Sequence, residues 1–550
     1  MIERLAAKYR PTWHGALLIG IFVAAVVLLT RDINAPFVRQ GSYDEIIYTL
    51  HARAYDRYGL TETRLALVFP PGDPAAPLGE QAHNPTRSVL LTVLLTFVYK
   101  LLGYHESAGR LIGITSTLVS LLALYYLVKQ LWTKRVAAIA VVAMAFTPSV
   151  VIFGRETWTV PPQMACWLVA IWLYVRWLQT EETSNLRGMT VSLTLGILFS
   201  PWSGWLLPPL IALHGLIFAA RHRWRILAWS LGALLAASAV FAAHFVWLGP
   251  LVWHDLLERI ALRVGVSGID VSPSAMAWLT KVAWRFSGWD TPIAILIGVA
   301  VLVGVILRAI KHRKLALPDQ ILLLLAAFGM AIILFFPQLA WTHHYVSLFI
   351  VPYLAVASAL IIDALIARAL QSKAALATIV TLSLGWIVWA TVMINVQSQY
   401  HLKELDIFAH LDQSLRPSDR VLVAGPVPFT FQFYFEHPWI RVGIDDDQWD
   451  QLGDSRRYAL GLIFFYPGSP VESPAASRAS PHPGGRVDTD PPLSPSFFVV
   501  QLDEADRPMD DLVSELNSIP ERSPPNPLET FVQETRKQVE IQLGIRTRPD

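Results

Sequence analysis

Long apolar runs recur along the first 395 residues of the chain, separated by short polar connections. A helix that crosses a lipid bilayer needs roughly 20 apolar residues. By this length rule about eleven runs qualify, at residues 14–30, 110–128, 136–153, 160–178, 188–202, 204–220, 226–247, 291–308, 317–336, 345–368 and 374–394. A further run at residues 88–102 is shorter and contains Lys100. The pattern predicts a mainly α-helical, polytopic membrane protein with about eleven transmembrane helices plus juxtamembrane helices.

Basic residues between the runs predict the orientation of the helices, because Lys and Arg stay on the cytoplasmic side. Basic clusters lie at the N-terminus, at residues 129–135, at 221–225 and at 308–314. All of them can be cytoplasmic only if the run at 88–102 does not cross the membrane, so we expect a juxtamembrane or partly embedded helix there. The outer side then receives residues 31–109, 154–159, 249–290, 337–344 and 395–550. The first run has a basic flank but no small-residue cleavage site, so we expect it to be retained.

The last part of the chain, residues 396–550, has a different pattern. A helix is expected near 402–415, and strands near 420–425, 459–466 and 496–502. Residues 467–495 contain eight prolines, which is typical of a disordered insert. We predict a transmembrane module of residues 1–395, whose first outer loop is 31–109, followed by a small extracytoplasmic α/β domain at 396–550.

Composition narrows the class of protein. Of the 550 residues, 54% are hydrophobic and 16% are charged, whereas a soluble domain carries about 25% charged residues. This excludes a soluble protein. The net charge of +2 gives no reason to expect a nucleic-acid partner. Cys166 is the one cysteine, so the chain cannot form an internal disulfide or a cysteine metal cluster.

Two acidic residues, Asp44 and Glu45, follow the first apolar run in the sequence GSYDEIIY at 41–48. A carboxylate pair at a membrane surface is unusual and indicates a functional site. Equally, the pair could simply begin an amphipathic helix, because acidic residues favour helix N-termini. The pair by itself leaves both interpretations open.

Two motifs further along the chain are expected on the same side of the membrane. His83-Asn84-Pro85 precedes the run at 88–102, where a proline is also an ordinary helix start. Arg155 and Glu156 lie at the end of the run at 136–153. As a cation and a carboxylate they suit phosphate binding and catalysis, or a plain surface ion pair.

A last motif, Trp341-Thr342-His343-His344-Tyr345, follows the run at 317–336. Consecutive histidines on a helix point in different directions, which disfavours joint binding of a metal. Taken alone, the motif is better explained by an interfacial belt of aromatic residues and histidines. What favours function is that all four motifs are expected on one side of the membrane.

In their order and spacing these motifs resemble the polytopic C-type (GT-C) glycosyltransferases. More narrowly, the chain is similar to bacterial and archaeal relatives of dolichyl-phosphate-mannose protein mannosyltransferase and of the lipid A aminoarabinose transferase. The segments that carry the resemblance are LLGYHESAGRLIGITSTLVSLLALYYLVKQLWTKRVAAIAVVAMAFTPSVVIFGRE and HHYVSLFIVPYLAVASAL, and it covers about residues 10–370. The resemblance implies a GT-C membrane enzyme that transfers a sugar from a polyprenyl-phosphate carrier to a lipid, glycan or protein acceptor.

The resemblance also implies catalytic roles. Asp44 stands where the family has its catalytic base, with Glu45 beside it. The family's second acid normally follows an arginine by several residues, but Pro161 and Pro162 stand there. Either Glu156 replaces it or the second acid is dispensable. The family's His-Pro-Pro is His83-Asn84-Pro85 in this chain, which is a second departure.

The leaving phosphate gains charge during transfer and needs cations and hydrogen-bond donors. The candidates for binding the donor phosphate or sugar are Arg53, His83, Arg87, Arg155, His343, His344 and Tyr345. For each basic residue, contact with lipid headgroups is the alternative explanation. No metal and no cofactor are expected, because the resemblance implies that the mannosyltransferase-like relatives need none.

Two other functions remain open at this point. A transporter or lipid flippase would place ionisable residues in the middle of its helices, whereas this chain places its carboxylates at helix ends. A non-catalytic scaffold would leave Asp44 replaceable. We expect a multi-pass protein of the cell membrane, with its catalytic face and its C-terminal domain on the outer side.

Overall fold

A computed structural model describes most of the chain as two compact units. The described residues are 13–37, 43–69, 87–200, 203–249, 251–264, 274–369, 372–397, 403–416, 419–425, 427–435, 437–442, 460–465, 472, 484–487, 496–501 and 509–519. The helical unit contains the described residues of 13–34 and 87–397, and the mixed unit contains those of 35–69 and 403–519.

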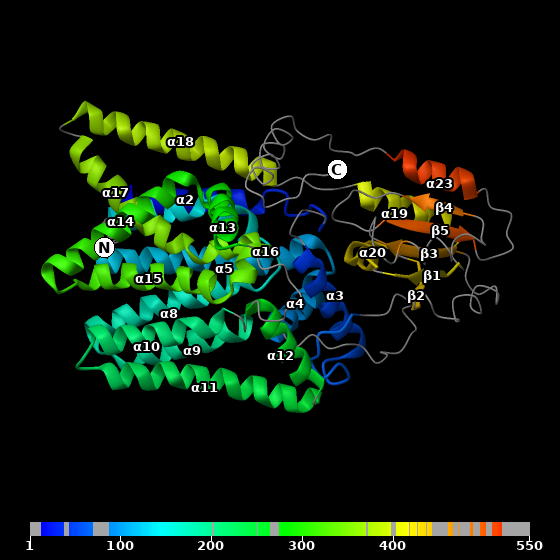
Figure 1. The fold of residues 1–550 in the computed structure, drawn as a ribbon, viewed down its shortest axis with the longest axis horizontal. Coiled ribbons are helices and arrows are strands. Elements are labelled where there is room, and N and C mark those ends of the chain that lie inside the picture. The colour runs from blue at the N-terminus through cyan, green and yellow to red at the C-terminus, as the bar shows by residue number, and fades with distance from the viewer. Residues whose placement is uncertain are drawn as a thin grey trace, which may run out of the picture. The chain divides into compact units, whose positions relative to one another are not determined.

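The helical unit is a bundle of long helices (Figure 1). Its elements are α2 (Trp13–Thr30), α4 (Val89–Leu102), α5 (Glu106–Leu131), α6 (Lys134–Ala145), α7 (Pro148–Phe153), α8 (Val160–Thr180), α9 (Thr183–Phe199), η1 (Gly204–Leu206), α10 (Leu207–Phe218), α11 (Arg223–Leu248), α12 (Leu251–Val264), α13 (Ala275–Asp290), α14 (Pro292–His312), α15 (Leu317–Phe335), α16 (Pro337–Thr342), η2 (His344–Phe349), α17 (Val351–Ala369) and α18 (Lys373–Gln397). Every apolar run that we expected to cross the membrane forms a helix.

Two of the runs beside candidate site residues are not continuous α-helices. The run at 136–153 is divided into α6 and α7 by Thr147 and Pro148. A proline disfavours helical geometry at the residue before it, and Thr147 is extended, with φ −73° and ψ 130°. The run at 345–368 begins as the 3₁₀ helix η2, and α17 starts only at Val351. The first break lies close to Arg155 and Glu156, and the second lies close to His343, His344 and Tyr345. The breaks therefore determine the backbone path of the segments that contain these candidate site residues.

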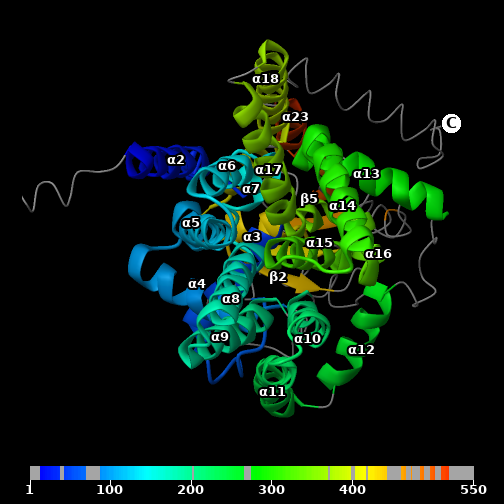
Figure 2. The ribbon, with the colours of Figure 1, turned by 90° about the vertical axis from the view of Figure 1, so that its left-hand side faces the viewer.

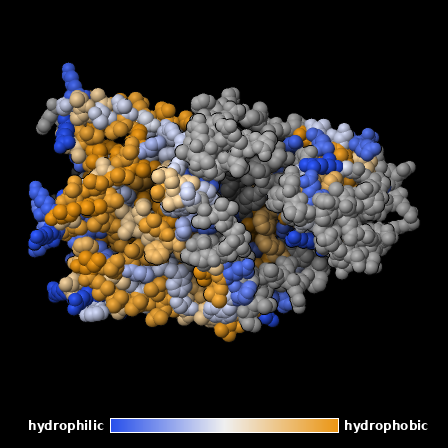
Figure 3. All heavy atoms as spheres, viewed as in Figure 1, coloured by the Kyte–Doolittle hydropathy of each residue, from blue (hydrophilic) through white to orange (hydrophobic). Residues whose placement is uncertain are grey.

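Among the described residues, six helices are long and apolar enough to cross a membrane by length and composition: α5, α11, α14, α15, α17 and α18. Hydrophobic atoms cover the flank of the helical unit in Figure 3, as a protein surrounded by lipid requires. The run at 88–102 forms α4, a shorter apolar helix outside this group. Leu94, Phe97 and Leu101 are exposed on it, whereas Leu95 and Tyr99 are buried. Such a one-sided helix is consistent with the expected juxtamembrane element.

The long helices pack against one another in an up-and-down arrangement, so their connections fall at two opposite ends of the bundle (Figures 1 and 2). The basic end holds the α5–α6, α10–α11 and α14–α15 connections. Its exposed basic residues include Lys134, Arg135, Arg221 and Lys311. The loop end holds the α7–α8 connection, α13 and η2. Arg155, Glu156, His343, His344 and Tyr345 therefore lie at one end of the bundle, away from the basic clusters.

The mixed unit is built on a five-stranded sheet with the order β2-β1-β3-β5-β4. The strands are β1 (Val421–Ala424), β2 (Trp439–Val442), β3 (Leu460–Phe465), β4 (Gly484–Val487) and β5 (Ser496–Gln501), and the helices are α3 (Tyr43–Tyr58), α19 (Lys403–Ser414), α20 (Phe429–Tyr434) and α23 (Met509–Ser518). Strand β1 is parallel to β2 and β3, whereas β5 is antiparallel to β3 and β4. The predicted α/β architecture is confirmed. Strand β4 lies within residues 467–495, the Pro-rich segment where we expected a disordered insert.

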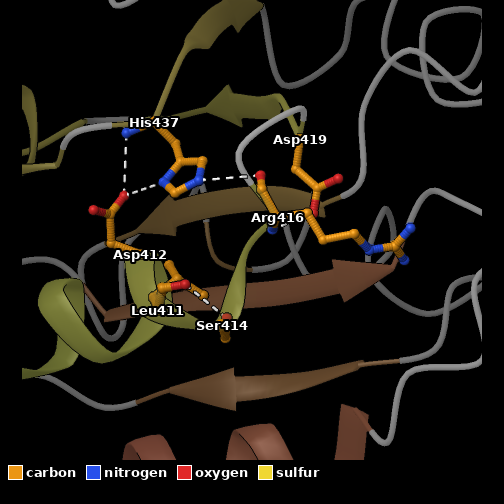
Figure 4. A network of polar contacts seen from close by, with 6 residues as sticks. All are labelled: Leu411, Asp412, Ser414, Arg416, Asp419 and His437. Carbon is orange, nitrogen blue, oxygen red and sulfur yellow. Dashed lines mark hydrogen bonds and ion pairs between the residues drawn. The ribbon is translucent and has the colours of Figure 1, made fainter.

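A polar network fixes the end of α19 beside β2 (Figure 4). Asp412 Oδ1 accepts hydrogen bonds from the backbone N–H of His437, at 3.1 Å, and from its Nδ1, at 2.5 Å. His437 Nε2 faces the carbonyl oxygen of Arg416 at 3.2 Å, and the Ser414 hydroxyl donates to the Leu411 carbonyl at 2.6 Å. Both ring nitrogens and the serine hydroxyl thus have structural partners, so the network is not a nucleophilic triad.

Candidate active site

The segment that carries Arg155 and Glu156 is pressed against one face of α5. A Cβ atom on Gly113 would lie 2.4 Å from the carbonyl oxygen of Glu156 and 2.9 Å from the carbonyl carbon of Arg155. One helical turn further on, the Thr117 hydroxyl donates to the Gly154 carbonyl at 2.6 Å. Because side chains do not tolerate such distances to backbone, glycine at position 113 is what allows the segment to lie here.

Gly109 continues this face of α5, since residues four apart share one side of a helix. A Cβ atom on Gly109 would lie 2.4 Å from the Tyr99 hydroxyl and 2.8 Å from the Thr157 hydroxyl. Tyr99 belongs to α4, and its ring stacks on Tyr104 with centroids 4.6 Å apart. Gly109 and Gly113 of α5 therefore allow the whole segment from Gly154 to Thr157 to pack closely against this helix.

Two buried arginines hold the turn that directly follows α2. Arg110 Nη1 donates to the carbonyl oxygens of Asp32 at 3.2 Å and Ile33 at 3.0 Å, and Arg155 Nη1 donates to the carbonyl oxygen of Arg31. These carbonyls belong to the turn that directly follows α2, and cations near the C-terminal end of a helix are favoured by its dipole. Arg155, a candidate for phosphate binding, thus has a structural partner in the helical unit.

Glu156 is 2% exposed, and an aromatic cluster surrounds the residues that follow it. The Trp158 ring meets the Tyr345 ring edge-on with centroids 4.3 Å apart, and Trp158 Nε1 donates to the Phe153 carbonyl at 3.0 Å. Tyr345 in turn packs on His343, with centroids 5.1 Å apart. Two motifs that are far apart in the sequence therefore meet at the loop end of the bundle.

The two histidines of this motif have different neighbours. His343 packs on Tyr345, whereas the His344 ring lies 5.6 Å from the ring of Trp289. The two rings diverge because His343 is extended, with φ −115° and ψ 126°, between α16 and η2, so the pair does not lie on one helix as the sequence argument assumed. Within the part of the chain that the structure describes, no group of three or more His, Cys, Asp or Glu residues is placed to hold a metal ion.

Asp290 is a buried acid that the sequence reasoning missed. It ends α13 and is 1% exposed, and its Oδ1 accepts a hydrogen bond from the Ser149 hydroxyl at 2.7 Å. Burial raises the pKa of Asp290 to about 7, and the hydroxyls of Ser149 and Ser347 partly oppose that shift. Ser149 belongs to α7 and Ser347 to η2, so Asp290 lies between the two segments that carry the motifs.

The backbone beside Asp290 is strained. Thr291 has φ +68° and ψ 133°, a conformation that β-branched residues rarely adopt. Its hydroxyl accepts from the Ala294 N–H at 3.3 Å and caps α14. In the sequence, Asp290-Thr291-Pro292 has the pattern of an ordinary helix start, which conceals both the strain and the burial of the acid.

In the mixed unit, Asp44 and Glu45 lie in the first turn of α3. Glu45 is 1% exposed and Asp44 is half-buried. The Arg53 side chain on the same helix reaches α20: its Nη1 donates to the Phe433 carbonyl at 3.1 Å, and its guanidinium carbon lies 4.0 Å from the centre of the Phe433 ring. Arg53, a candidate for phosphate binding, therefore makes a hydrogen bond and a cation–π contact within the mixed unit.

Two candidates remain at the start of α4. His83 lies outside the described residues. Arg87 is half-buried and directly precedes Ser88. The Ser88 hydroxyl accepts from the Leu91 N–H at 3.1 Å, as expected of a helix N-cap, and donates to the Leu198 carbonyl at 3.0 Å. The N-cap fixes the backbone from which Arg87 projects.

Solved structures resemble this arrangement over nearly the whole chain. ArnT from Cupriavidus metallidurans bound to undecaprenyl phosphate matches with a TM-score of 0.63, covering 88% of this chain and 97% of that chain at 13% identity. The protein has the GT-C fold. A second match is the oligosaccharyltransferase AglB from Archaeoglobus fulgidus, in complex with an inhibitory peptide and a dolichol-phosphate. Its TM-score is 0.54 at 15% identity, covering 92% of this chain and 75% of that one.

Sequence comparison adds a shorter match. The family model described as dolichyl-phosphate-mannose-protein mannosyltransferase matches residues 86–247. No curated protein matches the chain significantly. The family match includes α4 to α11 of the GT-C fold, and with them Gly113, Arg155 and Glu156, but neither Asp44 nor Tyr345.

Proposed function

We propose that this protein is a membrane glycosyltransferase that moves a sugar from a polyprenyl-phosphate donor to an acceptor on the outer face of the membrane. The observation that carries the proposal is the GT-C fold, which it shares over 88% of its length with an ArnT structure that holds undecaprenyl phosphate. The mannosyltransferase family match at residues 86–247 supports the same class of reaction.

Asp44 is the proposed base. In the transfer it takes the proton of the acceptor hydroxyl while the acceptor oxygen bonds to the anomeric carbon. The bond from that carbon to the phosphate oxygen breaks, and the polyprenyl phosphate leaves with the electron pair. The position of Asp44 in the first turn of α3 supports this role, because the helix dipole stabilises a carboxylate there. Glu45 and Glu156 are the proposed supporting acids.

The leaving phosphate needs positive charge and hydrogen-bond donors. Arg155 is the proposed cation, since a guanidinium binds phosphate oxygens through charge-assisted hydrogen bonds and this side chain lies at the loop end of the bundle. His343 and Tyr345, half-buried at the same end of the bundle, are the proposed donors to the sugar or phosphate, with His344 and Arg87 as further candidates. The proposal assigns them no metal or cofactor.

The position of the charged residues favours an enzyme over a transporter or flippase. In the six candidate spans, every Asp, Glu, Lys and Arg lies within two turns of a helix end. Asp363, in α17, is the deepest of the acids and forms an ion pair with Arg135 at the basic end. A path for ions or polar substrates places such groups in the middle of spans.

Vesicles that contain the full chain test the proposal. They are supplied with undecaprenyl phosphate linked to radiolabelled hexoses or pentoses. We expect the label to leave the lipid and to appear in an acceptor fraction, with free undecaprenyl phosphate as the second product. Movement of label across the vesicle membrane with the lipid–sugar bond intact would instead identify a flippase.

A further inference from the structure

The helix that carries Asp44 and Glu45 is packed on the C-terminal part of the chain. Phe37, Ile46, Leu50 and Phe433 form one buried core, with Phe69, Phe429 and Tyr434 packed around it. Ile46 and Leu50 lie four residues apart on α3, so one face of this helix rests on α20. Asp44 and Glu45 thus belong to a helix whose buried face packs against α20.

The segments on either side of α3 are fixed by the same helix. The Tyr434 hydroxyl accepts a hydrogen bond from the Phe37 N–H at 2.7 Å. After α3, Phe69 stacks on Phe429 with centroids 5.3 Å apart. His51 of α3 joins this stack, with its ring 4.6 Å from that of Phe69. Contacts before, along and after α3 therefore all lead to α20.

Helix α20 has two aromatic faces. Phe429 and Phe433, four residues apart, face α3 and its flanks. Phe431 and Phe435, also four apart, stack on each other at 4.4 Å, and Phe431 lies 5.2 Å from Phe464 of β3. Gly425, with φ +83°, directly follows the inner strand β1 and precedes α20. A short helix thus connects α3 to the centre of the sheet.

We infer that the C-terminal α/β part positions the acidic helix for sugar transfer, and that Arg53 is a positioning residue that acts through Phe433. The inference rests on the proposed function of Asp44. The Arg53 guanidinium is engaged by both the carbonyl and the ring of Phe433. A cation held against an aromatic face and a carbonyl fixes the rotation of α3 about its axis.

The competing role for Arg53 is direct contact with the donor phosphate. A double-mutant cycle separates the two, because residues that act through one contact give non-additive effects. We use Arg53→Met, which keeps the apolar stem, Phe433→Leu, and the double variant, all in the full chain in lipid nanodiscs. The assay is transfer from radiolabelled undecaprenyl-phosphate sugar.

The inference predicts a fall in kcat of roughly tenfold for each single variant, unchanged KM for the donor, and a double variant no worse than the poorer single one. Arg57→Met, one turn further along α3 and over the Tyr58 ring, is the control and should keep wild-type kcat. A raised donor KM in Arg53→Met with multiplicative effects in the double variant would overturn the inference.

Hydrogen exchange of α3 provides a readout that does not depend on activity. Residues 43–58 should exchange faster in Phe433→Leu and in the milder Tyr434→Phe, which loses one hydroxyl, while α15 is unchanged. Unaltered exchange in α3 would refute the inference even if the protein transfers sugar. Faster exchange with no transfer by the wild type would refute the proposed function and leave the packing role of α20 intact.

Discussion

The two segments that carry the candidate acids are held in different ways. In the helical unit, the backbone from Gly154 to Thr157 lies directly on α5 at Gly113. In the mixed unit, α3 rests on α20 through aromatic side chains and Arg53. Two backbones in contact cannot relieve a clash by a change of side-chain rotamer, whereas aromatic side chains can shift by small changes in their torsion angles. The first arrangement should therefore fail abruptly on substitution, and the second should fail by degrees.

The sharpest test of this difference is Gly113→Ala. The added methyl group would lie 2.4 Å from the Glu156 carbonyl oxygen, so the segment must move. A displacement of this order can cost at least about 100-fold in rate, and overpacking costs about 1–3 kcal/mol of stability. Transfer rate and thermal unfolding of the variant measure both effects. Gly232→Ala is the matched control, since nothing lies within 4 Å of its added Cβ.

Asp290→Asn should change the pH dependence of stability. Burial raises the pKa of Asp290 to about 7, so the folded state binds this proton more tightly than the unfolded state. The stabilisation is complete below pH 3.8, the ordinary pKa, and is lost as the pH rises to about 7. Across this window wild type should lose about 1.4 kcal/mol per pH unit relative to Asp290→Asn. Parallel stability curves for the two proteins would contradict the assignment.

Arg110→Met should weaken the turn that directly follows α2. The substitution leaves the Asp32 and Ile33 carbonyls without the donor that they have now. A hydrogen bond contributes about 0.5–1.5 kcal/mol, so the loss of these two part-buried bonds should lower stability by that order. Thermal unfolding measures the loss, and Arg176→Met, an exposed arginine on α8, should leave stability unchanged. An equal loss of thermal stability in Arg110→Met and Arg176→Met would show that the hydrogen bonds of Arg110 to the two carbonyls do not stabilise the fold.

The smallest effect is expected from Phe69→Leu in the mixed unit. It removes the stacking on Phe429 and His51 but keeps an apolar side chain. Aromatic pairs contribute about 1 kcal/mol beyond their burial, so unfolding should shift by that amount and transfer should fall only a few-fold. Phe97→Leu on the exposed face of α4 is the control. If Phe69→Leu lost as much transfer rate and stability as Gly113→Ala, the two segments would not differ in their tolerance of substitution.

The sequence predicts the fold class well because its strongest signals are local. Apolar length reveals the helices, and the alternation of turn and apolar segments reveals β1, β3 and β5, whereas β2 and β4 were not predicted. We expected one helix at 136–153, whereas the structure breaks it before Pro148, since proline restricts the residue before it. Even the meeting of Arg155 and Tyr345 at one end follows from the basic clusters at the other.

The missing parts depend on tertiary contacts. Gly109 and Gly113 look like ordinary small residues of an apolar helix, and only the neighbouring backbone reveals their role. Asp290 has the pattern of a helix start, although it is buried between α7 and η2. Arg53 has the composition of a phosphate ligand, and its contact with Phe433 depends on a residue 380 positions away. No local pattern encodes such pairs.

The central claim is that Asp44 is the base of a sugar transfer. It is tested most directly by Asp44→Asn in membranes supplied with radiolabelled undecaprenyl-phosphate sugar, beside Asp56→Asn, an exposed acid of the same helix. The amide keeps the size of the side chain but cannot accept the proton, so we expect a loss of about 100-fold or more in kcat, with little change for Asp56→Asn. Wild-type transfer by Asp44→Asn would contradict the account.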